Sequence, residues 1–244
     1  AARQRLLGSS PGAANKARGA ADCTNTLTTI SSEHTQPSGQ VLRIPVYFHV
    51  IYKADGEGYI SEARILDQMA VLNEDFSGGN GLSIQNTAIQ FDLVYVNYVQ
   101  NDSYFEDEGE GGFNKYSLAV DPGQYMNVYT NDSSGYLGYA TLPAGSAGGQ
   151  GDGVVMLHET IGGRNNGYGY YNQGRTLVHE VGHYLGLFHT FDPEGDCTNT
   201  YTGGDLIVDT PAQLYADSGT QPSTGCGPNS AIENFMNYGI DDAM

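Results

Sequence analysis

The chain has 244 residues, 39% of them hydrophobic, which suffices for one large domain with a core of its own. It contains no run of about 18 apolar residues, so no membrane-spanning segment is expected. The net charge of the whole chain is −18. Residues 1–40 have four basic and two acidic side chains, a net charge of +2, so residues 41–244 carry a net charge of −20. A domain with this excess of negative charge repels phosphate groups, so nucleic acid is not expected as a partner.

Residues 1–40 hold few large apolar side chains and many Ala, Gly, Ser and Thr. This composition predicts a flexible or partner-dependent segment that ends in a linker at residues 31–40. The folded domain is predicted to begin abruptly at residue 41, where a long β-branched and aromatic run starts.

Four segments of that domain have the composition of strands, namely residues 41–52, 89–99, 124–130 and 153–158. Two others have apolar residues at helical spacing, namely residues 61–76, with Ser61 as the N-cap, and residues 173–188. From Phe188 to residue 232 the sequence is mostly loop. We therefore predict an α/β (α+β) domain with a regular upper subdomain, 41–186, and a loop-rich lower subdomain, 187–244.

The strongest functional signal is the stretch HEVGHYLGLFH at residues 179–189. Residues four apart share one face of a helix, so His179 and His183 can bind the same metal ion. Gly186 is suited to end that helix in a left-handed conformation, after which His189 returns as a third ligand. Three protein ligands leave the fourth position of a zinc ion open for water, which is typical of catalytic rather than structural zinc.

Glu180 follows the first ligand directly, so its carboxylate can reach a zinc-bound water without binding the metal. We expect the zinc to polarise the scissile carbonyl and lower the pKa of the water, with Glu180 as the general base. The sequence thus predicts a zinc-dependent endopeptidase that hydrolyses peptides or proteins. Two alternatives stay open: an inactive, metal-dependent peptide-binding or adhesion protein, and an amidase with a non-peptide substrate.

The chain has three cysteines, an odd number. Cys197 and Cys226 flank one loop-rich stretch and can form a disulfide, whereas Cys23 stands apart in the basic segment. One disulfide and one additional thiol fit a secreted protein. We therefore predict an extracellular location.

These motifs resemble the metzincin clan of zinc peptidases and, within it, the pappalysin family with its small microbial members. The motifs that carry the resemblance appear in order: DGVV at 152–155, YNQGRT at 171–176, HTF at 189–191, GDLIVDTP at 204–211 and NFMNY at 234–238. The resemblance covers about residues 41–244. One departure is Asn237, where members of the family usually have Asp.

The resemblance implies a twisted, mixed five-stranded sheet with a backing helix and a zinc helix, followed by a subdomain with a Met-turn at Met236. Tyr238 is then expected to stabilise the transition state. The strand at residues 153–158 is expected at the edge of the sheet, where Val154, Val155 and Met156 would pair with the substrate. Asp241 is expected at the base of the S1′ pocket, which implies a preference for Arg or Lys at P1′.

Two further expectations follow from the resemblance. Asp205, Asp209 and Thr210 lie where the family binds calcium, which requires hard oxygen ligands. Cys23 is expected to bind the zinc in a latent form, because a thiolate can fill the open coordination position. Residues 1–40 would then act as an inhibitory pro-segment.

Overall fold

The computed structural model describes residues 39–79, 86–107, 113–163, 168–191, 205, 207, 210, 233–242 and 244. The predictions that concern Cys23, Asp209 and the Cys197–Cys226 disulfide lie outside these residues. Within the described part of the chain, no helix is long and apolar enough to cross a membrane.

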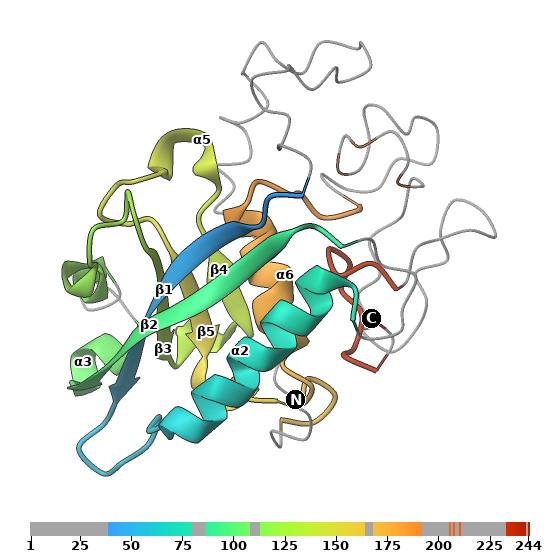
Figure 1. The fold of residues 1–244 in the computed structure, drawn as a ribbon. Helices are drawn as coiled ribbons and strands as arrows, with labels where there is room; N and C mark the ends of the chain where they lie inside the picture. The colour runs from blue at the N-terminus through green and yellow to red at the C-terminus, as the bar shows by residue number, and fades with distance from the viewer. Residues whose placement is uncertain are drawn as a thin grey trace.

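The domain is built on one mixed sheet of five strands (Figure 1). The strands are β1 (Leu42–Tyr52), β2 (Ile89–Gln100), β3 (Met126–Asn131), β4 (Gly138–Ala140) and β5 (Val154–Leu157). Their order in the sheet is β2-β1-β3-β5-β4. The first four in this order pair in parallel, and β4 pairs antiparallel with β5.

Two helices, α2 (Glu62–Ser77) and α6 (Arg175–Tyr184), pack against one face of this sheet. Because strand residues alternate between the faces, Phe48, Val128 and Met156 point into this helix-covered core. Ile51, Tyr129 and Val155 alternate with them and form a second apolar cluster on the opposite, outer face. The central strands are therefore apolar on both sides, as strands of parallel sheets generally are.

Short elements connect these strands and helices. They are α3 (Asp102–Phe105), η1 (Lys115–Leu118), η2 (Ser133–Gly135), α5 (Pro143–Ser146) and η3 (His158–Thr160). Helix α2 begins where predicted, since the Ser61 Oγ accepts a hydrogen bond from the Arg64 backbone N–H at 3.4 Å.

The four predicted strands correspond to β1, β2, β3 and β5, and the mixed five-stranded sheet is confirmed. The predicted edge position of residues 153–158 is wrong. Strand β5 lies between β3 and β4, and Val154, Val155 and Met156 are fully buried. Their backbone groups already pair with strands on both sides, so these residues cannot pair with a substrate; β4 occupies the edge instead.

Candidate active site

The candidate site is organised by helix α6, which ends earlier than the predicted residue 188. The backbone N–H of Gly186 donates to the His183 carbonyl, and that of Leu187 donates to the Gly182 carbonyl, both at 2.9 Å. Gly186 has φ +103°, so the last turn closes in the two-bond arrangement typical of a glycine-terminated helix. This reversal brings the chain back toward the face of α6 that carries His179 and His183.

The rings of His179, His183 and His189 meet there, all of them buried. The Nε2 of His183 lies 3.1 Å from that of His179 and 3.0 Å from that of His189, and the third distance is 3.3 Å. Three nitrogen ligands bound tetrahedrally to one zinc ion at 2.0–2.1 Å lie about 3.3 Å apart. The spacing of these three nitrogens therefore fits a zinc ion.

The hydrogen bonds of the rings support the same assignment. The Nδ1 of His179 donates to the Phe235 carbonyl at 2.6 Å, and the Nδ1 of His183 donates to the Leu187 carbonyl at 2.8 Å. A carbonyl only accepts, so each Nδ1 carries the hydrogen and each neutral ring presents a lone pair at Nε2. Burial also lowers the pKa of His179 to about 3, so this ring stays neutral. Two lone pairs 3.1 Å apart repel each other, and a cation between them removes that repulsion.

Glu180 lies beside this cluster and is fully buried. Neither of its carboxylate oxygens has a hydrogen-bond partner among the described residues. Burial raises the pKa of Glu180 well above its usual value. A divalent cation at the three imidazoles opposes this effect, because nearby positive charge favours the ionised carboxylate that a general base requires.

A turn at residues 234–237 packs against α6. Within this turn the Asn237 backbone N–H donates to the Asn234 carbonyl at 2.9 Å. Met236 is buried against Gly182 of the helix so closely that a Cβ at Gly182 would lie 2.3 Å from the Met236 sulfur. Met236, which the family resemblance implies as the methionine of a Met-turn, thus lies against the helix that carries His179 and His183. The ring of Tyr238 follows, with its centroid 4.7 Å from that of His189.

Asp241 lies at the other end of α6. Its Oδ2 accepts from the backbone N–H groups of Gln173 at 2.7 Å and Arg175 at 3.4 Å, and its Oδ1 has no partner among the described residues. The side chain is buried, and burial raises its pKa to about 6, although the two backbone N–H groups and the charge of Arg175 oppose the rise. A solvent-exposed terminal acid is therefore excluded.

Comparison with known proteins identifies the family. Residues 114–244 match the peptidase M43 model, described as pregnancy-associated plasma protein-A. An extracellular metalloprotease of Colletotrichum graminicola is 36% identical over 211 residues, which make up 82% of this chain and 70% of the relative. The chain belongs to the pappalysin family of metalloproteases. Extracellular metalloprotease 1 of Coccidioides posadasii is 32% identical to this pappalysin over 213 residues, or 83% and 71% of the two chains.

Solved structures agree with this assignment. Mature mirolysin of Tannerella forsythia, in complex with a cleaved peptide, matches with a TM-score of 0.69 and 29% identity, covering 85% of this pappalysin and 87% of that chain. A promirolysin mutant from the same organism gives a TM-score of 0.71 at 28% identity, covering 85% and 76%. The predicted family, fold and enzyme class are confirmed, and the names of the relatives confirm the predicted extracellular location.

Of the residues predicted to bind calcium, Asp205 and Thr210 lie in the described part of the chain. The buried Asp205 accepts from the Ile207 backbone N–H at 2.9 Å, and the Thr210 N–H donates to the Ile207 carbonyl at 3.3 Å. Both residues thus hydrogen-bond to Ile207, one to its backbone N–H and the other to its carbonyl. Calcium binding by this pappalysin stays a prediction.

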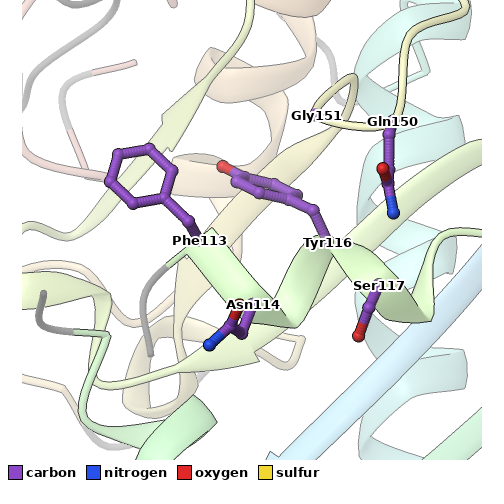
Figure 2. Close-up of a pocket in the computed structure, with 6 residues that line it drawn as sticks. All are labelled: Phe113, Asn114, Tyr116, Ser117, Gln150 and Gly151. Carbon is purple, nitrogen blue, oxygen red and sulfur yellow. The ribbon is translucent and has the colours of Figure 1, made fainter. Parts of the chain in front are cut away.

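The structure also has a pocket of about 300 Å³, whose lining residues are drawn in Figure 2. It is lined by Phe113, Asn114, Tyr116, Ser117, Gln150 and Gly151. Tyr116 belongs to the apolar cluster on the outer face of the sheet, opposite α6. This pocket is therefore not the site of catalysis.

Two features of the site have no recognisable pattern in the sequence. Strand β4 has three residues, and its Gly138 lies against Glu180: a Cβ there would lie 2.8 Å from the Glu180 Cγ. Tyr171 packs near Tyr238 and Ile240, and its buried hydroxyl has no partner among the described residues. The Gly-Tyr-Ala sequence of β4 lacks the long apolar run that is typical of a strand, and Tyr171 has no local signal beyond its place in the YNQGRT motif.

Proposed function

We propose that this pappalysin is a zinc endopeptidase in which His179, His183 and His189 hold the metal and Glu180 is the general base. The observation that carries the proposal is the convergence of three buried Nε2 atoms, two of them made acceptors by backbone carbonyls. The lone pairs of these nitrogen atoms repel one another in the absence of a cation, and a bound cation turns the repulsion into attraction. The buried carboxylate of Glu180, which has no hydrogen-bond partner among the described residues, lies next to it.

Bound at these imidazoles, zinc supplies a Lewis acid that polarises the scissile carbonyl and makes water easier to deprotonate. Glu180 accepts the proton of the attacking water and passes it to the leaving amine. Its burial keeps bulk water from competing for the carboxylate. The ring of Tyr238 packs beside His189, and its phenol O–H donates a hydrogen bond to the oxygen that becomes negative in the transition state.

Metal content and peptide turnover measured on two variants test this proposal. Glu180→Gln keeps the shape of the side chain and removes the base, so we expect one zinc per chain and a loss of kcat of at least about 100-fold. His183→Ala removes a ligand and should lose both zinc and turnover. An active Glu180→Gln variant would refute the assignment, and a protein that binds zinc and peptide but never cleaves would favour the inactive binding protein.

We further propose that substrate pairs with β4 rather than with β5. Strand β4 bonds to β5 on one side and lies at the edge of the sheet on the other. An extended peptide that adds to this edge gains main-chain hydrogen bonds, and these bonds do not depend on the side chains of the peptide. Peptides with an N-methyl group at a pairing position test this, because they keep every side chain and lose one donor.

The carboxylate of Asp241 supports the proposed preference for Arg or Lys at P1′. It is buried, has one oxygen without a partner among the described residues, and is held by backbone N–H groups at the start of α6. A cationic side chain satisfies such a group better than an apolar one does, because an ionised, unpaired acceptor inside a protein is costly.

Latency and calcium binding complete the proposal. Cys23 would bind the zinc in the precursor, and a Cys23→Ala precursor should then be active without processing. Calcium at Asp205, Asp209 and Thr210 would stabilise the loop-rich subdomain, so adding calcium at fixed zinc occupancy should raise the melting temperature. Unchanged precursor activity argues against the first idea, and an unchanged melting temperature argues against the second.

A further inference from the structure

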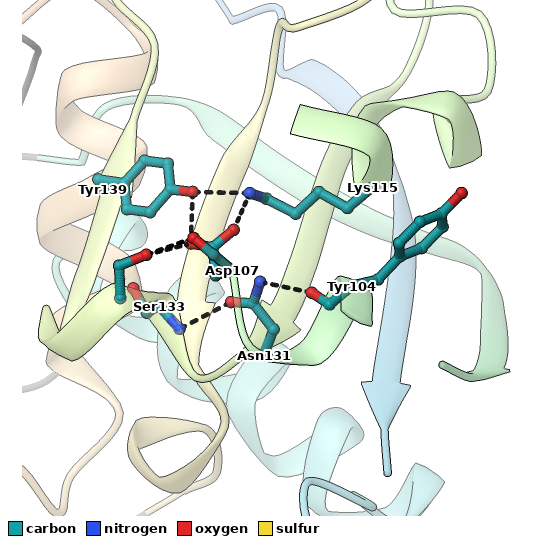
Figure 3. Close-up of polar contacts among 7 residues, drawn as sticks. Tyr104, Asp107, Lys115, Asn131, Ser133 and Tyr139 are labelled. Atoms are coloured by element: carbon teal, nitrogen blue, oxygen red, sulfur yellow. Dashed lines mark hydrogen bonds and ion pairs between the residues drawn. The ribbon is translucent and has the colours of Figure 1, made fainter. Parts of the chain in front are cut away.

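A buried ion pair lies on the outer face of the sheet, next to β4 (Figure 3). The Lys115 ammonium bonds to the Asp107 carboxylate and donates to the Tyr139 hydroxyl at 2.8 Å. That hydroxyl in turn donates to the second Asp107 oxygen at 2.8 Å. The side chains of Lys115 and Asp107 are each 1% exposed, and Tyr139 is the middle residue of β4.

Hydrogen bonds as well as opposite charges hold the three side chains of this cluster together. Burial lowers the pKa of Lys115, and the charge of Asp107 opposes that shift, so the ammonium depends on its partners. The Asp107 backbone carbonyl accepts from the Ser134 hydroxyl at 2.5 Å, which fixes the main chain that carries the carboxylate. A buried network with its donors and acceptors matched holds each member in one position. The Tyr139 hydroxyl is therefore held by two hydrogen bonds, one from Lys115 and one to Asp107, and the ion pair between these two residues fixes both partners.

The other face of β4 meets the catalytic residue. Side chains alternate along a strand, so Tyr139 points to the outer face while its neighbour Gly138 faces α6. A Cβ at Gly138 would lie 2.8 Å from the Glu180 Cγ and 3.0 Å from the Met156 sulfur. Glycine thus lets the strand touch the side chain of Glu180 directly.

Strand β4 needs such support because it is short. Its three residues pair with β5 alone among the described strands, and so short an edge strand has little stability of its own. We propose that the Lys115–Asp107 pair, through Tyr139, holds β4 where Gly138 contacts Glu180. Tyr139 and Gly138 are then positioning residues for both the base and the paired substrate, an inference that rests on the proposed function.

Tyr139→Phe tests the outer contact, because it keeps the ring and removes only the hydroxyl. We expect kcat/KM to fall by at least about 10-fold, since small displacements at a reacting centre have large effects on rate. In a Glu180→Gln background, binding of the uncleaved peptide should weaken as well. The matched control is Tyr104→Phe on the same face, whose hydroxyl bonds to Ser117 at 3.4 Å, and which should stay within about twofold of the wild type.

Gly138→Ala tests the inner contact. Gly138 does not have a left-handed φ, so alanine can adopt its backbone conformation. The added methyl would lie closest to the Glu180 Cγ, at 2.8 Å, and next to the Met156 sulfur at 3.0 Å and the Val155 carbonyl oxygen at 3.1 Å. We expect kcat to fall by at least about 10-fold with one zinc per chain and a smaller change in KM. The matched control is Gly151→Ala, because a Cβ there would meet no atom of the described residues within 4 Å.

The results separate the inference from the proposed function. A Glu180→Gln enzyme with normal turnover would refute the function itself. An inactive Glu180→Gln enzyme together with normal kcat and KM in Tyr139→Phe and Gly138→Ala would refute the inference alone. If Tyr139→Phe lowers the melting temperature without changing kcat or KM, the cluster only stabilises the fold, which also overturns the inference. Lower kcat with full zinc content in both variants supports it.

Discussion

The substitution Asp241→Asn gives the sharpest test of substrate recognition. It keeps the size of the side chain and an oxygen that can accept the Gln173 backbone N–H, which lies 2.7 Å from the Asp241 Oδ2. It removes the negative charge and places an amide group at the second carboxylate oxygen, which has no partner in the described part of the chain. The start of α6 should therefore remain intact while the attraction for a cationic P1′ side chain is lost.

The magnitude follows from the burial of Asp241, which is 1% exposed. Removing one member of a buried, hydrogen-bonded charge pair costs about 2 to 5 kcal/mol. We therefore expect kcat/KM for a peptide with Arg at P1′ to fall by at least about 30-fold. The same peptide with Leu at P1′ should be cleaved at an unchanged or higher rate, because its side chain gains nothing from the charge.

The assay is the ratio of kcat/KM for these two peptides, measured from pH 5 to pH 8. Both peptides meet the same proposed zinc site and general base, so the titration of these groups cancels in the ratio. The pKa of Asp241 is about 6 in the free enzyme, so the wild-type preference for Arg should weaken as pH falls through that value. An Arg/Leu ratio that is the same in wild type and variant would refute the role of Asp241.

The same substitution should stabilise the fold. The pKa of Asp241 rises from its usual 3.8 to about 6 on folding, so its stabilising effect is complete below pH 3.8 and lost as pH rises through about 6. The difference corresponds to at most about 3 kcal/mol above pH 6. Asp241→Asn should therefore melt at a higher temperature than the wild type at pH 8 and at a similar temperature at pH 4, as expected where function requires an unfavourable charge.

Three other predictions concern the support of the metal site and the pH dependence of the fold. Gly182→Ala should destabilise the protein by about 1 to 3 kcal/mol and weaken zinc binding, because its Cβ would lie 2.3 Å from the Met236 sulfur; thermal unfolding and zinc titration measure both. Removing zinc with a chelator should lower the melting temperature, and re-adding zinc should restore it, since a ligand bound only by the native state stabilises it; no change on chelation would contradict the metal assignment. Burial lowers the pKa of His49, so the stability that its neutral ring contributes is fully present above pH 6.5 and is lost as the pH falls toward the pKa of the folded state. Between pH 7 and pH 5, the free energy of unfolding in urea should therefore decrease less for His49→Gln than for the wild type.

The parts of the site that could be predicted depend on local sequence. The spacing of His179 and His183 fixes their common helix face, and the left-handed glycine at 186 reverses the chain toward His189. Long β-branched runs likewise gave strands within one or two residues of their observed bounds. In each case the physical cause lies within a few residues of the effect.

The failures involve contacts between distant segments. A run such as Val154–Leu157, apolar on every residue, indicates a strand covered on both faces, but it does not identify the neighbours of that strand in the sheet. Strand β4 is too short to show a periodic pattern, and its place at the edge depends on pairing with β5. The ion pair beside it joins Asp107 and Lys115 to Tyr139, a contact that no local pattern predicts.

The segment 233–242 connects these observations, because it contacts α6 at three points along its length. The Phe235 carbonyl orients His179, Met236 packs against Gly182, and the Asp241 carboxylate binds the N–H groups at the start of the helix. Metal ligation and the proposed P1′ recognition therefore share one support. If binding an Arg side chain at Asp241 restrains this segment, it should also tighten zinc binding, and by thermodynamic reciprocity zinc should tighten peptide binding by the same factor. Peptide affinity of the Glu180→Gln variant, measured with and without zinc, gives that factor, and the peptide with Leu at P1′ should give a smaller one.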